Sequence, residues 1–426
     1  MQSWVEGANE PHGFGLGHLP YGAFRVDGVP HLCVRIGEML FDLHTAAGDE
    51  IFDPLSPELC EACRQPTLHS LLALGPPAWQ ALREHLTGLL AEDVPPKTRK
   101  RIDWFLHFVE HSELTLPIAP RGYTDFYASI HHARRVGELF RPDAPLLPNY
   151  KHVPIAYNGR ASSLVASGTP ILRPHGQQRP RGEGEPPRFA PTAALDYELE
   201  LAFIVGAGNA LGSPIAIEHA NEHLFGVALL NDWSARDIQS WEYQPLGPFL
   251  GKSFATSLSP WITPMAALEP FRVASAPRTA DDPQPLPYLT DANDQRHGAL
   301  DIALNVSLTT AQSRAAALSP FAISQSNASG LFWTPAQMLA HHTSNGCNLE
   351  AGDVLGTGTI SGPRREQAAC LLELTRNGVE PLTLPNGERR AWLQDGDEVI
   401  LSARCEREGT ETITLAECSG QIVAAR

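Results

Sequence analysis

The sequence predicts a mainly β protein of the α+β class, with a small first domain and a larger second one. The chain has 426 residues, a length that favours two or three domains. Its 35 glycines and 37 prolines are typical of short strands joined by many turns. From about residue 118 onward strand patterns predominate, and Asn377-Gly378, Asn386-Gly387 and Asp395-Gly396 each predict a hairpin or tight connection.

The first part of the chain mixes strand and helix patterns. The strand-like runs YGAFRV and EMLFDL precede TLHSLLALGPPAWQALREHLTGLLA, which predicts a helix interrupted at Pro76-Pro77. A charged, proline-bearing segment, AEDVPPKTRKR, follows that helix. We therefore predict one domain over residues 1–118 and a second over residues 119–426.

Composition and charge exclude several classes of protein. With 42% hydrophobic and 19% charged residues, the chain is globular rather than disordered. A net charge of -16 argues against nucleic acid or an anionic membrane as the partner. No run approaches the roughly 20 apolar residues that span a bilayer, and the start MQSWVEGANEPHGFG lacks the pattern of a signal peptide. We expect a cytoplasmic protein whose seven scattered cysteines are reduced.

Residues 195–206, LDYELELAFIVG, predict a strand with two unlike faces. The odd positions are apolar, whereas Asp196, Glu198 and Glu200 occupy even positions. Successive side chains of a strand point to opposite faces, so the carboxylates share one side. That side is either a solvated outer face or part of a cation site that takes further oxygen ligands from elsewhere in the chain.

A second segment with chemical potential is GYTDFYASIHHARRVGELFRP. Asp125 lies in its aromatic strand pattern, and a helix is predicted from about Ala128. His131 and His132 then lie in the first helical turn, where the positive end of the helix dipole keeps an imidazole neutral and basic. The alternative is that the histidine pair only caps or decorates the helix.

The segment LFGVALLNDWSARDIQSWEYQPLGPFLGKSFATSLSPWI predicts a buried strand that ends at Asp232. Asp232 is either the N-cap of the next turn or part of a site for an anionic ligand held above a metal. Polar side chains at helical spacing, or just beyond a Gly-Pro-rich turn, favour the second interpretation: Arg236, Gln239, Tyr243, Lys252 and Thr256. Further on, Glu373 in AACLLELT is predicted on a strand, opposite core-facing leucines, where such a glutamate usually faces solvent.

Together these segments resemble the fumarylacetoacetase family over nearly the whole chain. The family's blocks stand here in order as YTDFYASIHHA, SGTPILRPHGQ, DYELELAFIVG, NDWSARDIQSWEYQPLGPFLGKSF and NGCNLEAGDVLGTGTISGP. The resemblance implies a small SH3-like N-terminal barrel, a larger catalytic β-roll or sandwich domain, and a homodimer. It also implies a hydrolase that cleaves the carbon–carbon bond of 4-fumarylacetoacetate to fumarate and acetoacetate, the last step of tyrosine and phenylalanine catabolism.

The resemblance further implies a role for each matching residue. A divalent cation, Mg²⁺ or Ca²⁺, would be held by Asp125, Glu198, Glu200 and Asp232, with Lys252 and Thr256 beside it. Because a protonated lysine cannot ligate a metal, Lys252 is expected to act as a charged neighbour. The implied catalytic residues are His132 as general base, Glu373 as its orienting partner, and Arg236, Gln239 and Lys252 around the developing oxyanion. The implied substrate-binding residues are Tyr127, Arg141, Arg236, Gln239, Tyr243 and Thr359.

Two other interpretations stay open. One is another enzyme of the same superfamily, such as an acylpyruvate hydrolase or a decarboxylase, although such relatives generally lack the N-terminal domain. The other is a non-catalytic calcium-binding β module, which has no use for His132 beside Glu373. The doubled histidine also leaves His131 as an alternative base. We expect a small diketo acid as the ligand, with neither nucleic acid nor membrane as a partner.

Overall fold

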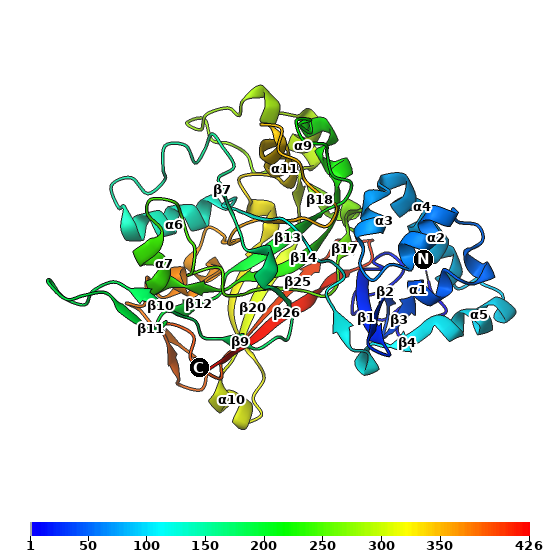
Figure 1. Cartoon of the computed structure of the whole chain (residues 1–426), viewed down its shortest axis with the longest axis horizontal. Coiled ribbons are helices and arrows are strands. Elements are labelled where there is room, and N and C mark those ends of the chain that lie inside the picture. Colours follow the sequence, from blue (N-terminus) through cyan, green and yellow to red (C-terminus); the bar gives the residue numbers. More distant parts are fainter. Residues whose placement is uncertain (1) are drawn as a thin grey trace.

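The structure is a computed structural model that describes residues 2–426, and it confirms a strand-rich α+β fold (Figure 1). The N-terminal region, from β1 to β5, forms an antiparallel five-stranded sheet of order β4-β3-β2-β1-β5, at the right of Figure 1. Its strands are β1 Tyr21–Val26, β2 Val29–Ile36, β3 Met39–Asp42, β4 Leu106–Phe108 and β5 Leu114–Thr115. Its helices are α1 Leu43–Ala46, α2 Pro57–Cys63, α3 His69–Ala73, α4 Pro76–Leu90 and α5 Pro96–Ile102.

The rest of the described chain is built around two sheets. The larger one has the order β7-β6-β22-β13-β14-β16-β8, with β17 also paired to β14. Its strands are β6 Tyr123–Phe126, β7 Ala156–Asn158, β8 Leu164–Ala166, β13 Leu199–Val205, β14 Leu224–Asp232, β16 Thr256–Leu258, β17 Thr263–Pro264 and β22 Val354–Gly356. The second sheet has the order β21-β20-β25-β26-β9, built from β9 Ile171–Leu172, β20 Ala303–Thr309, β21 Phe321–Asn327, β25 Glu398–Cys405 and β26 Ile413–Val423.

Short hairpins and helices complete this part of the molecule. The two-stranded pairs are β10 His175–Gln178 with β11 Arg188–Pro191, β12 Leu195–Asp196 with β15 Ser234–Ala235, β18 Arg272–Val273 with β19 Ala299–Leu300, and β23 Leu382–Thr383 with β24 Arg389–Arg390. The helices are α6 Ile130–Phe140, α7 Arg236–Glu242, α8 Met265–Leu268, α9 Ala292–His297, α10 Ala311–Ala315, α11 Pro335–Thr343 and α12 Leu371–Leu374. None of the described helices combines the length and apolar composition that crossing a membrane requires.

The larger sheet is buried on both faces. The odd residues of β13, such as Leu201 and Phe203, join the core that this sheet shares with the second sheet. The even residues Ala202 and Ile204 join the core of the N-terminal region instead. The N-terminal region therefore packs against the side of the large sheet that also carries the even-numbered carboxylates.

The predicted acidic strand and the predicted helix break both have clear counterparts. Residues 195–206 contain two strands instead of the one predicted: β12 pairs with β15, and β13 pairs with β14 and β22. Between the two strands, the side chain of Asn231 accepts the backbone N–H of Glu198 at 3.1 Å. The helical pattern breaks as predicted, since α4 begins at Pro76. The Asn386-Gly387 turn joins β23 to β24, and all seven cysteines are free.

A buried histidine links the N-terminal region to the large sheet and makes stability depend on pH. His18 bonds through Nδ1 to the Gly13 carbonyl and through Nε2 to the Thr263 hydroxyl, each at 2.8 Å. Burial lowers the pKa of His18 from 6.5 to about 3. Below about pH 6.5 this histidine is therefore protonated in the unfolded chain but not in the folded protein. The free energy of unfolding falls by about 1.4 kcal/mol per pH unit between pH 6.5 and pH 3 as a result.

We expect His18→Gln to flatten the fall in unfolding free energy between pH 6 and pH 4, measured by urea titration. His111→Gln is the matched control, because the side chain of His111 is exposed beside Glu110. Equal slopes in the two variants would contradict this role for His18.

Candidate active site

Four buried carboxylates converge where strands of the large sheet end. Asp125 lies on β6, Glu198 just before β13, Glu200 on β13, and Asp232 at the end of β14. In this carboxylate cluster, one oxygen from each residue lies within 4.8 Å of the other three. No member is more than 5% exposed, so the solvated-face interpretation is wrong for Glu198 and Glu200. The even-numbered face of β13 is acidic at the cluster and apolar further along.

Two glycines, one that ends β22 and one just after it, lie against the carboxylates. Gly358 donates its backbone N–H to Asp125 Oδ1 at 3.1 Å and to Glu200 Oε2 at 3.0 Å. At Gly356 a Cβ atom would lie 2.6 Å from Asp125 Oδ1 and 3.2 Å from Glu200 Oε2. A side chain at Gly356 would therefore push these two carboxylates out of place.

Gly356→Ala is expected to weaken binding of Mg²⁺ or Ca²⁺ by about 10–100-fold, the usual cost of disturbing the surroundings of metal ligands. Isothermal titration calorimetry measures this affinity directly. Gly330→Ala is the control, because a Cβ atom there would meet no atom within 4 Å. An unchanged affinity in Gly356→Ala would show that the cluster tolerates the displacement.

Two cationic side chains contact the carboxylate cluster. Lys252 Nζ lies 2.5 Å from Glu198 Oε2 and 2.6 Å from Asp232 Oδ2. Arg236 Nη2 lies 2.7 Å from Glu198 Oε1. Burial by itself would lower the pKa of Lys252, but Asp232 and Glu198 raise it above its ordinary value, so the lysine stays charged. With all four carboxylates ionised, the two cations would leave at least two negative charges uncompensated.

The remaining charge and an unpaired oxygen both fit a divalent cation. Burial, together with the neighbouring carboxylates, raises the pKa of Asp125 and of Glu200 well above the ordinary range. Glu200 Oε1 is buried without a hydrogen-bond partner in the described chain. A hard, doubly charged cation would satisfy this oxygen and offset the repulsion, and an all-oxygen ligand set favours Mg²⁺ or Ca²⁺ over softer metals. Thr256 Oγ1 donates weakly to Asp232 Oδ1, at 3.5 Å.

The second element of the site is a buried pair formed by His132 and Glu373. Helix α6 begins at Ile130, two residues later than predicted, because Ser129 caps it by accepting the N–H of His132. His132 Nδ1 lies 2.6 Å from Glu373 Oε1. Burial alone would raise the pKa of Glu373, but His132, Ser361 and Arg135 lower it to about 2, so the carboxylate is ionised and only accepts. The imidazole proton therefore sits on Nδ1, and Nε2 is left as the basic nitrogen.

The prediction that Glu373 lies on a strand is wrong, since it lies on the short helix α12. The apolar run LLEL suits either a strand or a buried helix. The helix is stabilised because Asp196 accepts the backbone N–H groups of Leu371 and Leu372. Glu373 is buried rather than solvent-facing. Two further partners of Glu373 were not predicted: Arg135 Nη1 donates to Oε2 at 2.9 Å, and the Ser361 hydroxyl donates to Oε1 at 2.6 Å. Arg135 could have been predicted, because it follows His132 by three residues and so lies on the same face of the helix.

The expected substrate residues are not all gathered at one point. The Tyr127 ring packs edge-on against His132, with centroids 5.3 Å apart. Thr359 is buried, and its hydroxyl has no partner within residues 2–426. Gln239 accepts from Arg236 Nη1 at 3.2 Å. Arg141 and Tyr243 instead end helices α6 and α7, and no described hydrogen bond or ion pair joins either residue to the cluster.

A tyrosine beside the cluster was not anticipated. Tyr157 on β7 donates its hydroxyl to Asp232 Oδ2 at 2.8 Å. Its strand pairs with β6, which places Tyr157 directly across from Asp125. The sequence around it, HVPIAYNGR, carries no signal of this contact, because only the strand pairing brings it to the cluster.

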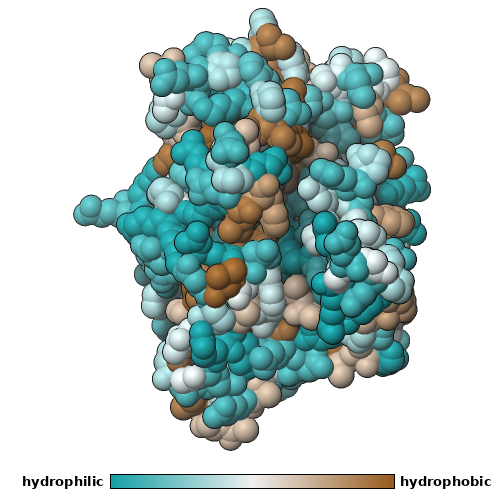
Figure 2. Space-filling model, turned by 90° about the vertical axis from the view of Figure 1, so that its left-hand side faces the viewer, coloured by the Kyte–Doolittle hydropathy of each residue, from teal (hydrophilic) through white to brown (hydrophobic). Residues whose placement is uncertain are grey.

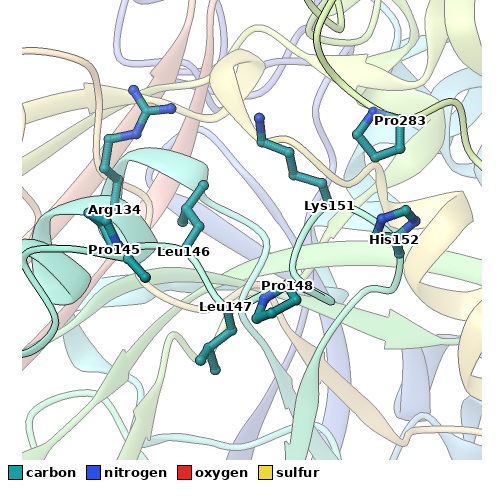
Figure 3. A pocket seen from close by; sticks show the side chains of 9 residues that line it. Arg134, Pro145, Leu146, Leu147, Pro148, Lys151, His152 and Pro283 are labelled. Atoms are coloured by element: carbon teal, nitrogen blue, oxygen red, sulfur yellow. The ribbon is translucent and has the colours of Figure 1, made fainter.

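A separate pocket lies beside α6. It measures about 430 Å³ and contains none of the residues of the carboxylate cluster (Figure 3). In Figure 3 the side chains of Arg134 and Lys151 both point upward, Arg134 at the left of the view and Lys151 near its centre. Lys151 is already paired with Asp282. The pocket is therefore distinct from the chemistry at the cluster.

Comparison with known proteins identifies the family of the chain. Residues 121–421 match the family model described as Fumarylacetoacetate (FAA) hydrolase C-terminal, and residues 17–117 match Fumarylacetoacetase N-terminal. The chain is 44% identical to a fumarylacetoacetase of Arabidopsis thaliana, covering 99% of this chain and 98% of the relative. It is 45% identical to a fumarylacetoacetase of Homo sapiens, covering 98% and 97%.

A solved structure adds a comparison of fold. The fumarylacetoacetate hydrolase from psychrophilic Exiguobacterium antarcticum aligns with a TM-score of 0.52 at 19% identity, covering 96% of this chain and all of that one. This likeness concerns the fold alone, whereas the sequence matches span both parts of the chain at high identity. The chain belongs to the fumarylacetoacetase family.

Proposed function

We propose that this protein hydrolyses 4-fumarylacetoacetate to fumarate and acetoacetate, as a step of tyrosine and phenylalanine catabolism. The observation that carries the proposal is that one chain holds both a buried carboxylate cluster and the buried His132–Glu373 pair. The names of the relatives, which match nearly the full chain, support the choice of substrate. A calcium-binding module without activity would gain nothing from a buried imidazole held on a carboxylate.

The proposed chemistry starts at His132. With Nδ1–H donated to Glu373, Nε2 takes a proton from water, and the water oxygen attacks the substrate carbonyl beside the fumaryl group. Arg236, Gln239 and Lys252 then stabilise negative charge on the carbonyl oxygen; loss of one such donor typically lowers turnover by about 10²–10³. The carbon–carbon bond then breaks, and its electron pair stays on the acetoacetate carbon. His132 donates to that carbon the proton that it took from water.

The proposed cofactor is one Mg²⁺ or Ca²⁺ ion held by the carboxylate cluster. When bound, it would supply Lewis-acid stabilisation of negative charge on the substrate oxygens. Lys252 is proposed to balance charge beside Glu198 and Asp232 rather than to ligate, because it stays protonated. Thr256 is proposed to support Asp232. The proposed substrate contacts are Tyr127, Arg141, Arg236, Gln239, Tyr243 and Thr359.

One assay tests this proposal against the nearest alternatives. Purified protein is mixed with fumarylacetoacetate, acylpyruvates or oxaloacetate, and loss of substrate absorbance is followed with and without a chelator. We expect turnover of fumarylacetoacetate that chelation abolishes and Mg²⁺ or Ca²⁺ restores. Faster turnover of acylpyruvates, or release of CO₂ from oxaloacetate, would instead favour another enzyme of the superfamily.

We further propose that the chain works as a homodimer. Large apolar side chains are exposed on α7 and the segment after it: Trp241, Leu246, Phe249 and Leu250, with Leu246 96% exposed. Figure 2 shows apolar patches around a hollow on the side of the molecule where α7 lies in Figure 1. Exposed large apolar side chains in such number favour association. Sedimentation velocity is expected to give a dimer that Leu246→Glu weakens.

The domain division 1–118 and 119–426 and a cytoplasmic location also belong to the proposal. The two family matches, which end at residue 117 and begin at residue 121, support the division. Seven free cysteines are in keeping with a reducing compartment. Neither nucleic acid nor membrane is a proposed partner, in line with the net charge of -16.

A further inference from the structure

We propose that Asp196 is a positioning residue that couples the anion-stabilising Arg236 to the helix carrying Glu373. The inference rests on the proposed function and extends it to a residue that touches neither the cluster's metal-facing oxygens nor the substrate. Asp196 lies two positions before Glu198, yet its side chain does not join the carboxylate cluster. It is fully buried between α7 and α12.

The carboxylate of Asp196 has all of its acceptor capacity in use. Oδ2 accepts from Arg236 Nε at 2.9 Å and from the Leu372 backbone N–H at 2.9 Å. Oδ1 accepts from the backbone N–H groups of Leu371 at 2.7 Å and Tyr197 at 2.9 Å. A carboxylate offers about four lone-pair sites, so these four donors saturate it.

These contacts stabilise a helix that cannot cap itself. Cys370 occupies the N-cap position of α12, but its side chain accepts none of the backbone N–H groups of the helix. The first N–H groups of a helix need partners, and here Asp196 supplies them from 175 residues away in the chain. Glu373 is the third residue of this four-residue helix. The position of Glu373, and through it the orientation of His132, therefore depends on Asp196.

The same side chain fixes one edge of Arg236. The guanidinium is held by Asp196 at Nε, by Glu198 at Nη2 and by Gln239 at Nη1. Removing the Asp196 contact frees the guanidinium to rotate toward Glu198. We therefore expect a substitution of Asp196 to disturb both the His132–Glu373 pair and the Arg236 guanidinium, although Asp196 contacts no reacting atom.

Asp196→Asn is the sharpest test, because it keeps the shape of the side chain and replaces one accepting oxygen by a donating NH₂ group. An amide nitrogen in place of either oxygen faces two N–H donors and loses both bonds. We expect kcat to fall about 10²-fold while KM stays within about twofold, as for a loss felt mainly in the transition state. Asp397→Asn is the matched control, since Asp397 is an equally buried carboxylate that pairs with Arg390 and accepts the Gln394 N–H outside the site.

A double-mutant cycle separates positioning from general damage. If Asp196 acts in part through Glu373, Asp196→Asn should cost clearly less than about 10²-fold in a Glu373→Gln background, because there only its contact with Arg236 is left to lose. Losses that multiply would overturn the coupling, and so would a kcat of Asp196→Asn equal to the wild-type value. If Asp196→Asn does not fold, Asp196→Glu keeps the charge but moves the carboxylate; wild-type kcat in that variant would equally overturn the inference. Wild-type protein that does not turn over fumarylacetoacetate would instead refute the proposed function, before any variant is compared.

Discussion

Replacing His132 by alanine is expected to abolish hydrolysis of fumarylacetoacetate, whereas His131→Ala retains most of it. His132 is buried and bonded to Glu373, so its Nε2 is the nitrogen free to take a proton from water. General-base catalysis contributes about 10²–10⁴ to the rate, and a loss of this size is expected in kcat. His131 is only half-buried and lies about 100° further round the helix, which directs it away from Glu373.

The measurement is the initial rate of absorbance loss at saturating substrate, with circular dichroism to confirm folding. Added imidazole is expected to restore part of the activity of His132→Ala, since the variant leaves a space of that size beside Glu373. His131→Ala serves as the matched control on the same helical turn. The opposite pattern of activities would move the base by one residue.

Glu373→Gln is expected to lower turnover by roughly 10²–10⁴ while leaving cation affinity intact. The carboxylate receives donors from His132, Ser361 and Arg135, and an amide cannot accept from all three. At least one donor would face an N–H group, and the negative charge that stabilises the imidazolium would be gone. Glu373 is not part of the carboxylate cluster, so Mg²⁺ or Ca²⁺ binding should persist in calorimetric titration.

Glu388→Gln is a suitable control for this prediction. Glu388 is a similarly bonded glutamate, which accepts from Thr310 and pairs with Arg390 in another part of the molecule. We expect it to lose stability without losing turnover per folded molecule. Undiminished activity in Glu373→Gln would remove this residue from the proposed mechanism.

Several features of the site were predictable because they depend on local pattern. Alternation in DYELEL placed Glu198 and Glu200 on one side of a strand, and the structure brings both into one cluster with Asp125 and Asp232. The position of His132 in the first turn of a helix followed from the apolar spacing of α6. The residue roles came from resemblance to a family, since each motif taken alone allowed a structural explanation.

Other features depend on contacts between distant segments, which no local pattern records. Asp196 obeys the same alternation as Glu198, yet it lies on a separate strand, β12, and its carboxylate contacts α12. Glu373 sits in an apolar run that suits a strand, and the capping of α12 by Asp196 makes it helical. Tyr157 and Arg135 are ordinary in sequence and reach the site only through strand pairing and helix orientation.

The fold class, the family resemblance and the acidic and basic side chains available for chemistry were predictable, because periodicity and long motifs are properties of consecutive residues. Contacts between distant segments make the acidic face buried, let Gly356 leave room for its carboxylates, and place Asp196 against α12 and Arg236 instead of in the cluster. The physical reason is that burial and hydrogen-bond partnership are properties of segments that meet in space. A carboxylate is a solvated surface group or a cation ligand according to what the rest of the chain places around it.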